Sequence, residues 1–387
     1  MDIIQSNDTK ELDFSYLILN KLPDLSNFYR LEKLNISHNI LTELSLLDTL
    51  IEVNISNNQL KKLPQIPYKL QILDCSYNQL PVLPLLPNTL KSLDCSNNKL
   101  TELPQLPDTL EKLYCCYNRI KILPLLPNTL KIFSCQKNQI KELPLFPNTL
   151  EKLYCGGNEL LELPLLPIIL EELNCQFNQL EKLPLLPKTL KLLNCNINKL
   201  TVLPLLPDTL KEIECSYNKL TVLPLLPNTL KNLYCEGNKL TVLPLLPNTL
   251  TTLDCADNKL IKLPLLPNIL EKLCCNGNKL MILPLLPSTL EGSIIIFNYI
   301  DNPIYDFIKS RNINIINTTC NILRKFKFTY YLGKYKQQFI NFYYKRIVEP
   351  KVIIRSHPSN LFKIIEDNLG MDLDKIIDKF ENMIDNV

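Results

Sequence analysis

Alanine is almost missing from this 387-residue sequence, in which Ala256 is the only example, whereas proline occurs 29 times. Alanine has the highest helix propensity of all residues, and proline interrupts helices because it lacks an amide hydrogen. This composition excludes a mainly helical fold for most of the chain. Hydrophobic residues make up 46% of the sequence, which is enough to form a core and argues against general disorder.

Long apolar runs are also lacking, since no segment approaches the roughly 18 residues needed to span a bilayer. We therefore expect no membrane span. Residues 1–11 contain no apolar segment typical of a secretory signal, which favours a cytoplasmic protein. The formal net charge is only +3, so the chain as a whole has no strong attraction to nucleic acid or to an anionic membrane.

Residues suited to catalysis are equally scarce. His38 and His357 are the only histidines, and the seven glycines form no phosphate-binding loop. No side chain lies in a motif that pairs a nucleophile with a general base. The sequence therefore predicts a protein that is not an enzyme and that uses no cofactor.

A pattern of 20 residues recurs along most of the chain, with the core L-x-x-L-x-C-x-x-N-x-L. This period and core are typical of leucine-rich repeats. We expect a β-rich solenoid of about fourteen coils over residues 31–302, after an N-terminal cap and partial repeat over residues 1–30. The cysteine of the pattern recurs at Cys75, Cys95, Cys115, Cys135, Cys155, Cys175, Cys195, Cys215, Cys235, Cys255 and Cys275.

Each position of the repeat has a physical interpretation. Leu93 and Cys95 lie two residues apart, so both point to the same side of a short strand, and stacked coils pair these strands into a parallel concave sheet. Asn98 and its equivalents should bond to backbone groups at the bend and form a ladder. The return segment has proline at every third residue, which favours an extended, polyproline-II-like convex side with Leu83 and Leu86 turned inward.

The pattern L-P-x-L-P-x-x-L-x-x-L-x-C-x-x-N-x-L resembles the 20-residue repeats of the YopM and IpaH bacterial effectors over about 70% of the chain, residues 31–300. Cysteine replaces their usual valine or isoleucine. The resemblance implies a protein-binding solenoid that acts on a host protein in the host-cell cytoplasm. It does not extend to the ubiquitin-ligase motif of the IpaH-like proteins, because Cys320 is followed by Asn321 and Ile322. The composition also resembles leucine-rich-repeat proteins of giant DNA viruses related to mimivirus.

The repeat pattern ends near residue 302, and residues 303–387 are expected to form a small α-helical C-terminal appendage. Residues 318–351 of this appendage are basic and aromatic. One interpretation is an amphipathic helix that covers the last coil. The alternative is a segment that binds nucleic acid or an anionic membrane, which would make the solenoid a passive spacer.

The cysteine column is interpreted as core and not as a metal or redox site. Adjacent cysteines in a parallel ladder have parallel Cβ vectors, which do not suit a disulfide, and a straight column does not supply the tetrahedral ligands of zinc. Buried cysteine also packs as a small hydrophobic residue. We therefore expect no metal and unreactive thiols, with Cys116 and Cys274 outside the column and partly exposed.

The concave sheet face is the candidate binding surface. The residue between each inward pair points outward and varies from coil to coil, whereas the core positions are nearly constant. Tyrosines among acids and amides suit a protein partner with a basic surface. The alternative is that the sheet face is only solvated and binds no partner. The predicted binding residues are Asp74, Asp94, Tyr114, Tyr154, Asn174, Asn194, Glu214, Tyr234 and Asp254.

Overall fold

The computed structural model describes residues 8–280, 283–290, 317–318 and 321. Residues 8–280 and 286–290 belong to one compact unit, and residues 283–285, 317–318 and 321 belong to a second. In the first unit, fourteen strands form a single parallel sheet in the order of the sequence. The strands are β1 (Glu11–Asp13), β2 (Lys33–Asn35), β3 (Glu52–Asn54), β4 (Ile72–Asp74), β5 (Ser92–Asp94), β6 (Lys112–Tyr114), β7 (Ile132–Ser134), β8 (Lys152–Tyr154), β9 (Glu172–Asn174), β10 (Leu192–Asn194), β11 (Glu212–Glu214), β12 (Asn232–Tyr234), β13 (Thr252–Asp254) and β14 (Lys272–Cys274).

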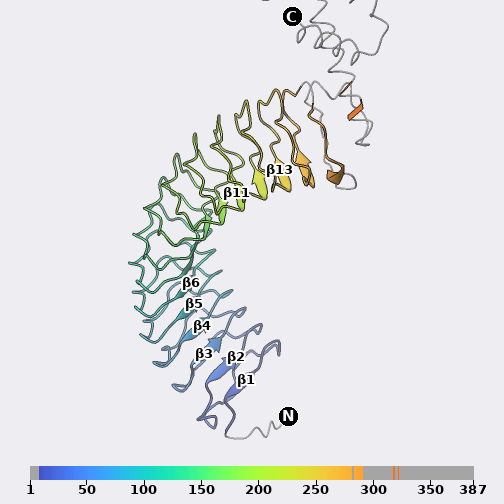
Figure 1. Cartoon of the computed structure of the whole chain (residues 1–387). Helices are drawn as coiled ribbons and strands as arrows, with labels where there is room; N and C mark the ends of the chain where they lie inside the picture. The colour runs from blue at the N-terminus through green and yellow to red at the C-terminus, as the bar shows by residue number, and fades with distance from the viewer. Residues whose placement is uncertain (1–7, 281–282, 291–316, 319–320, 322–387) are drawn as a thin grey trace, which may run out of the picture. The chain divides into compact units, whose positions relative to one another are not determined.

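This solenoid unit curves, and its strands line the inner side of the curve (Figure 1). Each strand has only three residues, and its central side chain is buried between two outward neighbours. The pairing between neighbouring strands advances by 20 residues in the regular coils, for example from Leu93 to Leu113. It advances by 19 residues from Leu34 to Val53, so this early coil is one residue shorter than the others. The predicted parallel concave sheet is thus confirmed.

The asparagine ladder is present and is highly connected. The Asn98 Nδ2 atom donates to the carbonyl oxygens of Cys75 at 3.0 Å, Cys95 at 3.1 Å and Ser96 at 3.2 Å. Its Oδ1 atom accepts the amide hydrogen of Leu80 at 2.9 Å. One side chain therefore binds its own bend and joins two coils, which satisfies backbone groups that the turn leaves unpaired.

The bend before each ladder asparagine requires an unusual backbone conformation. Most residues at this position have a positive φ, including Tyr117 at 52°, Phe177 at 52° and Ile197 at 52°. Glycine adopts this region freely, whereas a β-branched residue such as Ile197 does so at a conformational cost. The hydrogen bonds of the asparagine ladder hold the chain in this turn.

The return segments contain no helix within residues 8–280, in agreement with the prolines of the repeat. The expectation that Leu83 and Leu86 both turn inward is only half right. Leu83 is buried, but Leu86 and most of its equivalents are half-buried, and Leu85 is 86% exposed. The return segment has no simple period that predicts which of its leucines face inward. In most repeats, only the leucine equivalent to Leu83 is fully buried in the coil.

A second ladder, which the sequence analysis missed, joins the return segments. The Thr109 Oγ1 atom lies 2.9 Å from the Asn88 carbonyl oxygen and 2.8 Å from the Leu90 carbonyl oxygen of the preceding coil. The same pair of bonds recurs at most equivalent threonines, such as Thr129 and Thr229. The repeated N-T or D-T dipeptide was the signal for this ladder.

Within the described residues, β14 is the last strand of the sheet. The short 3-10 helix η1 (Ser288–Leu290) follows it in the sequence. Of the predicted helical appendage, residues 317–318 and 321 are described and are helical. The rest of residues 303–387, with Cys320, His357 and most of the basic aromatic segment 318–351, lies outside the described residues. No helix in the described ranges is long and apolar enough to cross a membrane.

Candidate protein-binding surface

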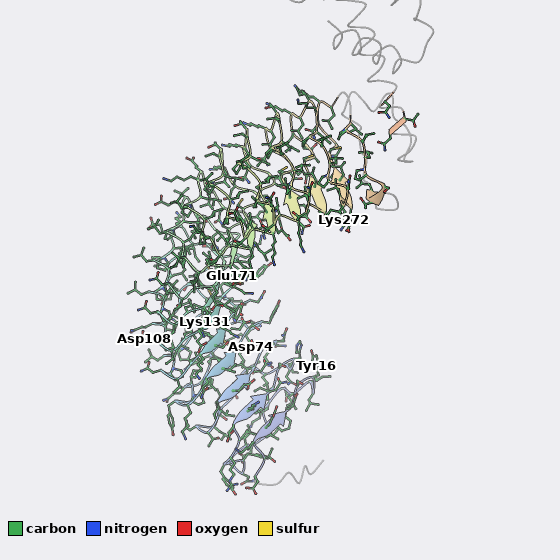
Figure 2. All side chains as sticks on the ribbon, in the orientation of Figure 1. Tyr16, Asp74, Asp108, Lys131, Glu171 and Lys272 are labelled. Carbon is green, nitrogen blue, oxygen red and sulfur yellow. The ribbon has the colours of Figure 1, made fainter. Side chains whose placement is uncertain are left out.

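The outward side of the sheet carries all the residues that the sequence analysis proposed for binding. Each is the last residue of its strand, from Asp74 in β4 to Asp254 in β13, and each is half-buried between neighbouring coils. Figure 2 shows Asp74 and Lys272 on the inner side of the curve and Asp108 on the outer side. The prediction of which side chains face outward from the sheet therefore agrees with the structure.

Many of these side chains also have a structural role that the sequence analysis missed. The Asp94 Oδ1 atom accepts the amide hydrogen of Ser96 at 2.9 Å, which caps the strand where the chain begins to bend. Asp74, Asn174, Asn194 and Asp254 accept the amide two residues later in the same way. An acidic or amide residue two positions before the bend was the sequence signal that could have predicted this capping. These positions are therefore not free to vary for binding alone.

Tyr154 is already engaged with its neighbours on the sheet. Its hydroxyl donates to the Glu172 carboxylate, which also pairs with the Lys152 ammonium at 2.7 Å. Burial and the Glu172 carboxylate raise the pKa of Tyr154 above its ordinary value. Burial opposes ionisation of Glu172, but the bonds from Lys152 and Tyr154 hold its pKa below the usual range. Lys152 and Glu172, at the first position of their strands, were not among the predicted residues.

A shallow depression of about 150 Å³ lies on the sheet between β8 and β11. It brings together four of the predicted residues and adds Glu172 and Glu212. The Glu214 carboxylate accepts hydrogen bonds from the Nδ2 atoms of Asn194 and Asn196, both at 2.7 Å. The predicted residues in the depression are Tyr154, Asn174, Asn194 and Glu214.

The acidic side chains of this face are incompletely solvated. Burial raises the pKa of Asp94 and of Asp254. Burial and the nearby Glu212 carboxylate raise the pKa of Glu214. Because partial burial removes water from these carboxylates, a cationic side chain from a partner would replace the lost stabilisation.

The cysteine column packs in the core beneath this face as free thiols. Burial raises the pKa of Cys175 and of Cys215 to about 12, so their thiolates are disfavoured. Cys116 is half-buried, and its Sγ atom lies 2.9 Å from the Ser134 Oγ atom. Among the described residues, no group of three or more His, Cys, Asp or Glu side chains is placed to hold a metal ion.

A solenoid with one parallel sheet, buried leucines and an asparagine ladder defines a leucine-rich-repeat protein. Comparison with known proteins leads to the same class. The family model "Leucine Rich Repeat" matches residues 89–108. YopM from Yersinia pestis is 40% identical over 72% of this chain and 80% of its own length, with a TM-score of 0.68. YopM from Yersinia enterocolitica WA-314 is 34% identical over 72% of this chain and 71% of its own, with a TM-score of 0.66. The chain therefore belongs to the leucine-rich-repeat family, with bacterial-type repeats like those of YopM.

The description of another similar solved structure also mentions stacked cysteines. The functional domain of InlJ from Listeria monocytogenes, described as including a cysteine ladder, is 26% identical over 70% of this chain and 64% of its own, with a TM-score of 0.63. A search of curated protein sequences finds no match. Solenoids of this kind offer extended concave surfaces to other proteins, so the fold is generally that of a protein-interaction scaffold.

Proposed function

We propose that the chain is a non-catalytic scaffold that binds a protein partner through the concave face of the solenoid. The observation that carries the proposal is the contrast between the inward and outward positions of each strand. Leu93, Leu113 and Leu153 occupy the same buried place, whereas the adjacent outward residues are Asp94, Tyr114 and Tyr154. Packing accounts for the constant positions, and recognition of a partner, together with capping of the bend by the acidic and amide residues, accounts for the varied ones.

The charge of this face suits a partner with a basic surface. Glu212 and Glu214 lie on β11 and Asp254 lies on β13, and the carboxylates of Glu214 and Asp254 are already partly desolvated. A lysine or arginine that approaches them avoids part of the desolvation cost that an exposed ion pair would incur. The affinity should therefore fall as the salt concentration rises.

Tyr114 and Tyr234 are better candidates than Tyr154 for aromatic anchors. All three tyrosines are half-buried, but the Tyr154 hydroxyl is held by Glu172. Tyrosine is neutral near pH 7, and burial raises the pKa of Tyr114 and of Tyr234 further, so both present a neutral ring with a hydroxyl at its tip.

The test is a double substitution, Tyr114→Ala with Tyr234→Ala, in the full chain. After a partner has been captured from host lysate and purified, its affinity for the variant should fall by roughly 30-fold or more, as for truncation of anchor residues elsewhere. Tyr68→Ala is the matched control, because Tyr68 is 64% exposed and lies in a return segment. Thermal unfolding of each variant should stay close to that of the unmodified chain.

Unchanged affinity in the double variant would contradict the proposal. Deletion of residues 318–387 distinguishes it from the alternative prediction that the basic aromatic segment binds nucleic acid or an anionic membrane. Loss of partner binding only on that deletion would assign recognition to the tail. A cytoplasmic site of action, within a host cell as for an effector, belongs to the same proposal.

A further inference from the structure

A row of leucines projects from the return segments into solvent. We call this row, one residue from each of eight successive coils, the leucine ridge. Each of these side chains is 82–87% exposed, whereas Leu203 and Leu223, two residues before ridge members, are 4% exposed. Single exposed leucines are ordinary, but a continuous row of them marks an interaction surface. The ridge consists of Leu125, Leu145, Leu165, Leu185, Leu205, Leu225, Leu245 and Leu265.

A column of exposed lysines accompanies the second half of the ridge. We call these residues the lysine flank, and they occupy the position after the ladder asparagine in five successive coils. Neighbouring coils are about 5 Å apart at the sheet, so these charges repel one another. Among the described residues, no carboxylate forms an ion pair with any of them. The lysine flank consists of Lys199, Lys219, Lys239, Lys259 and Lys279.

The two halves of the return side differ sharply in charge. Residues 198–207, 218–227 and 238–247 have the identical sequence N-K-L-T-V-L-P-L-L-P, which contains no acidic residue. In the coils from 118 to 187, the same segments carry equal numbers of basic and acidic residues. Those residues are Arg119, Lys121, Lys141 and Lys182 against Glu142, Glu159, Glu162 and Glu181.

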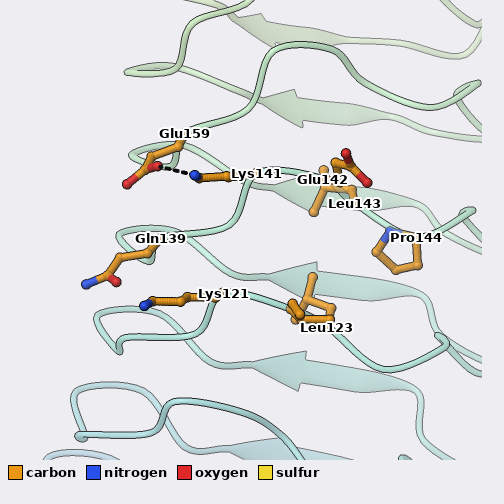
Figure 3. A pocket seen from close by; sticks show the side chains of 9 residues that line it. Lys121, Leu123, Gln139, Lys141, Glu142, Leu143, Pro144 and Glu159 are labelled. Atoms are coloured by element: carbon orange, nitrogen blue, oxygen red, sulfur yellow. Dashed lines mark ion pairs between the residues drawn. The ribbon is translucent and has the colours of Figure 1, made fainter.

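The positions of the lysine flank and the return segment share one continuous surface. In the first half, an open depression of about 670 Å³ is lined by Gln139 and Glu159 at the flank position and by Glu142 and Pro144 of the return segment. Figure 3 shows these side chains along one side of adjacent coils, with Lys141 paired to Glu159 at 3.9 Å. In the three coils that share the identical sequence, the residues equivalent to Gln139, Lys141 and Glu142 are lysine, threonine and valine. In the second half of the ridge, each leucine follows the flank lysine of its coil by six residues, as Leu205 follows Lys199.

We propose that the return side of residues 198–267 docks on an anionic lipid bilayer as a peripheral surface. Leucines enter the boundary between headgroups and acyl chains, and the lysine flank binds the anionic headgroups. A nucleic acid would match the lysines but would leave the leucines exposed beside phosphates. A folded protein would need a groove that fits a protruding row, whereas a fluid lipid surface adapts to it.

This orientation fits the charge on the opposite side of the same coils. Glu212, Glu214 and Asp254 lie on the sheet face, away from the return segments. An anionic membrane repels those carboxylates and attracts the lysine flank, so both effects favour the same orientation. Docking through the return side leaves the concave face open to a protein partner, and it goes beyond the scaffold function proposed above.

The test uses the full chain with vesicles of phosphatidylcholine, with and without phosphatidylserine, and measures the bound fraction after sedimentation. The variant Lys219→Gln, Lys239→Gln, Lys259→Gln should bind anionic vesicles on the order of 100-fold more weakly. The variant Leu205→Gln, Leu225→Gln, Leu245→Gln should lose on the order of ten-fold or more. Both changes have precedents within the chain, since glutamine occupies the equivalent places at Gln65, Gln105, Gln139 and Gln179.

The matched control is Leu145→Gln, Leu165→Gln, Leu185→Gln, which removes ridge leucines beside the electrically neutral coils. This variant should change vesicle binding less than three-fold, an order-of-magnitude expectation for residues away from the contact. Circular dichroism and thermal unfolding should show that all three variants remain folded. Equal loss in the control, full binding by the lysine variant, or no binding of the unmodified chain to anionic vesicles would overturn the proposal. So would leucine-dependent dimers without vesicle binding.

Discussion

The sheet side and the return side of this solenoid use the same repeat in opposite ways. On the sheet side, the outward residue changes from Asp94 to Tyr114 to Ser134 in successive coils. On the return side, a ten-residue string is repeated without change in the coils that begin at Asn198, Asn218 and Asn238. Because the buried residues determine the conformation of the coil, the exposed residues on each side can be selected for the surface that they bind. A varied face suits recognition of one irregular partner, and a uniform face suits a uniform surface.

The strongest way to break this comparison is to remove the framework that both sides share. Asn178→Ala deletes three hydrogen bonds from Nδ2 to carbonyl oxygens. It also deletes the bond in which Oδ1 accepts the amide hydrogen of Leu160 in the preceding coil. The Nδ2 atom carries two hydrogens, so its three hydrogen bonds amount to about two full bonds. At about 1 kcal/mol net for each full bond, the free energy of unfolding should fall by about 3 kcal/mol. Urea denaturation measures the change.

The matched control is Asn228→Ala, because Asn228 is exposed in a return segment. Its substitution should cost less than about 0.5 kcal/mol. Similar losses for the two variants would mean that the asparagine ladder does not hold the coils together.

A second substitution pair sharpens the difference within one return segment. Leu203 is 4% exposed and Leu205 is 83% exposed, although only Pro204 separates them. Leu203→Ala should lower the free energy of unfolding by about 3 kcal/mol, because it leaves a cavity in the core. Leu205→Ala should change it by less than about 0.5 kcal/mol. Equal effects in urea denaturation would show that the ridge packs against protein.

The return segments also show where prediction from sequence reached its limit. The period of 20 residues, the inward pair at Leu93 and Cys95 and the asparagine ladder follow from spacing and backbone chemistry. The sequence L-P-L-L-P has no such alternation, so the prediction turned both Leu83 and Leu86 inward, whereas only Leu83 is buried and Leu86 is half-buried. The bond from Tyr154 to Glu172 joins residues 18 apart on adjacent strands, and its geometry depends on side-chain conformations that a repeat pattern does not define.

The smallest expected effect comes from Asp94→Asn on the sheet side. Asparagine keeps the acceptor for the Ser96 amide, as Asn174 does for Gln176, but removes a carboxylate whose pKa is raised by burial. A raised pKa in the folded state means that ionisation of Asp94 lowers stability. The variant should therefore be slightly more stable than the unmodified chain at pH 7.

The pH dependence of this difference provides the check. As the pH falls through the folded-state pKa, Asp94 becomes protonated and the charge penalty disappears. The advantage of the variant should then shrink between pH 7 and acid pH in thermal unfolding. An advantage that grows on acidification would give the opposite sign and contradict the assigned effect of burial.

The most direct test of the central claim compares the two sides of a single coil with the same change of charge. Glu212→Lys lies on the sheet side and Asp208→Lys on the return side, and Lys152 and Lys188 already occupy the equivalent positions. The measurement is the Kd of each variant for the captured protein partner by isothermal titration calorimetry. Binding through the concave face predicts a Kd raised about ten-fold or more by Glu212→Lys, and little changed by Asp208→Lys. A Kd that responds to Asp208→Lys and not to Glu212→Lys would place the partner on the return side and contradict the account.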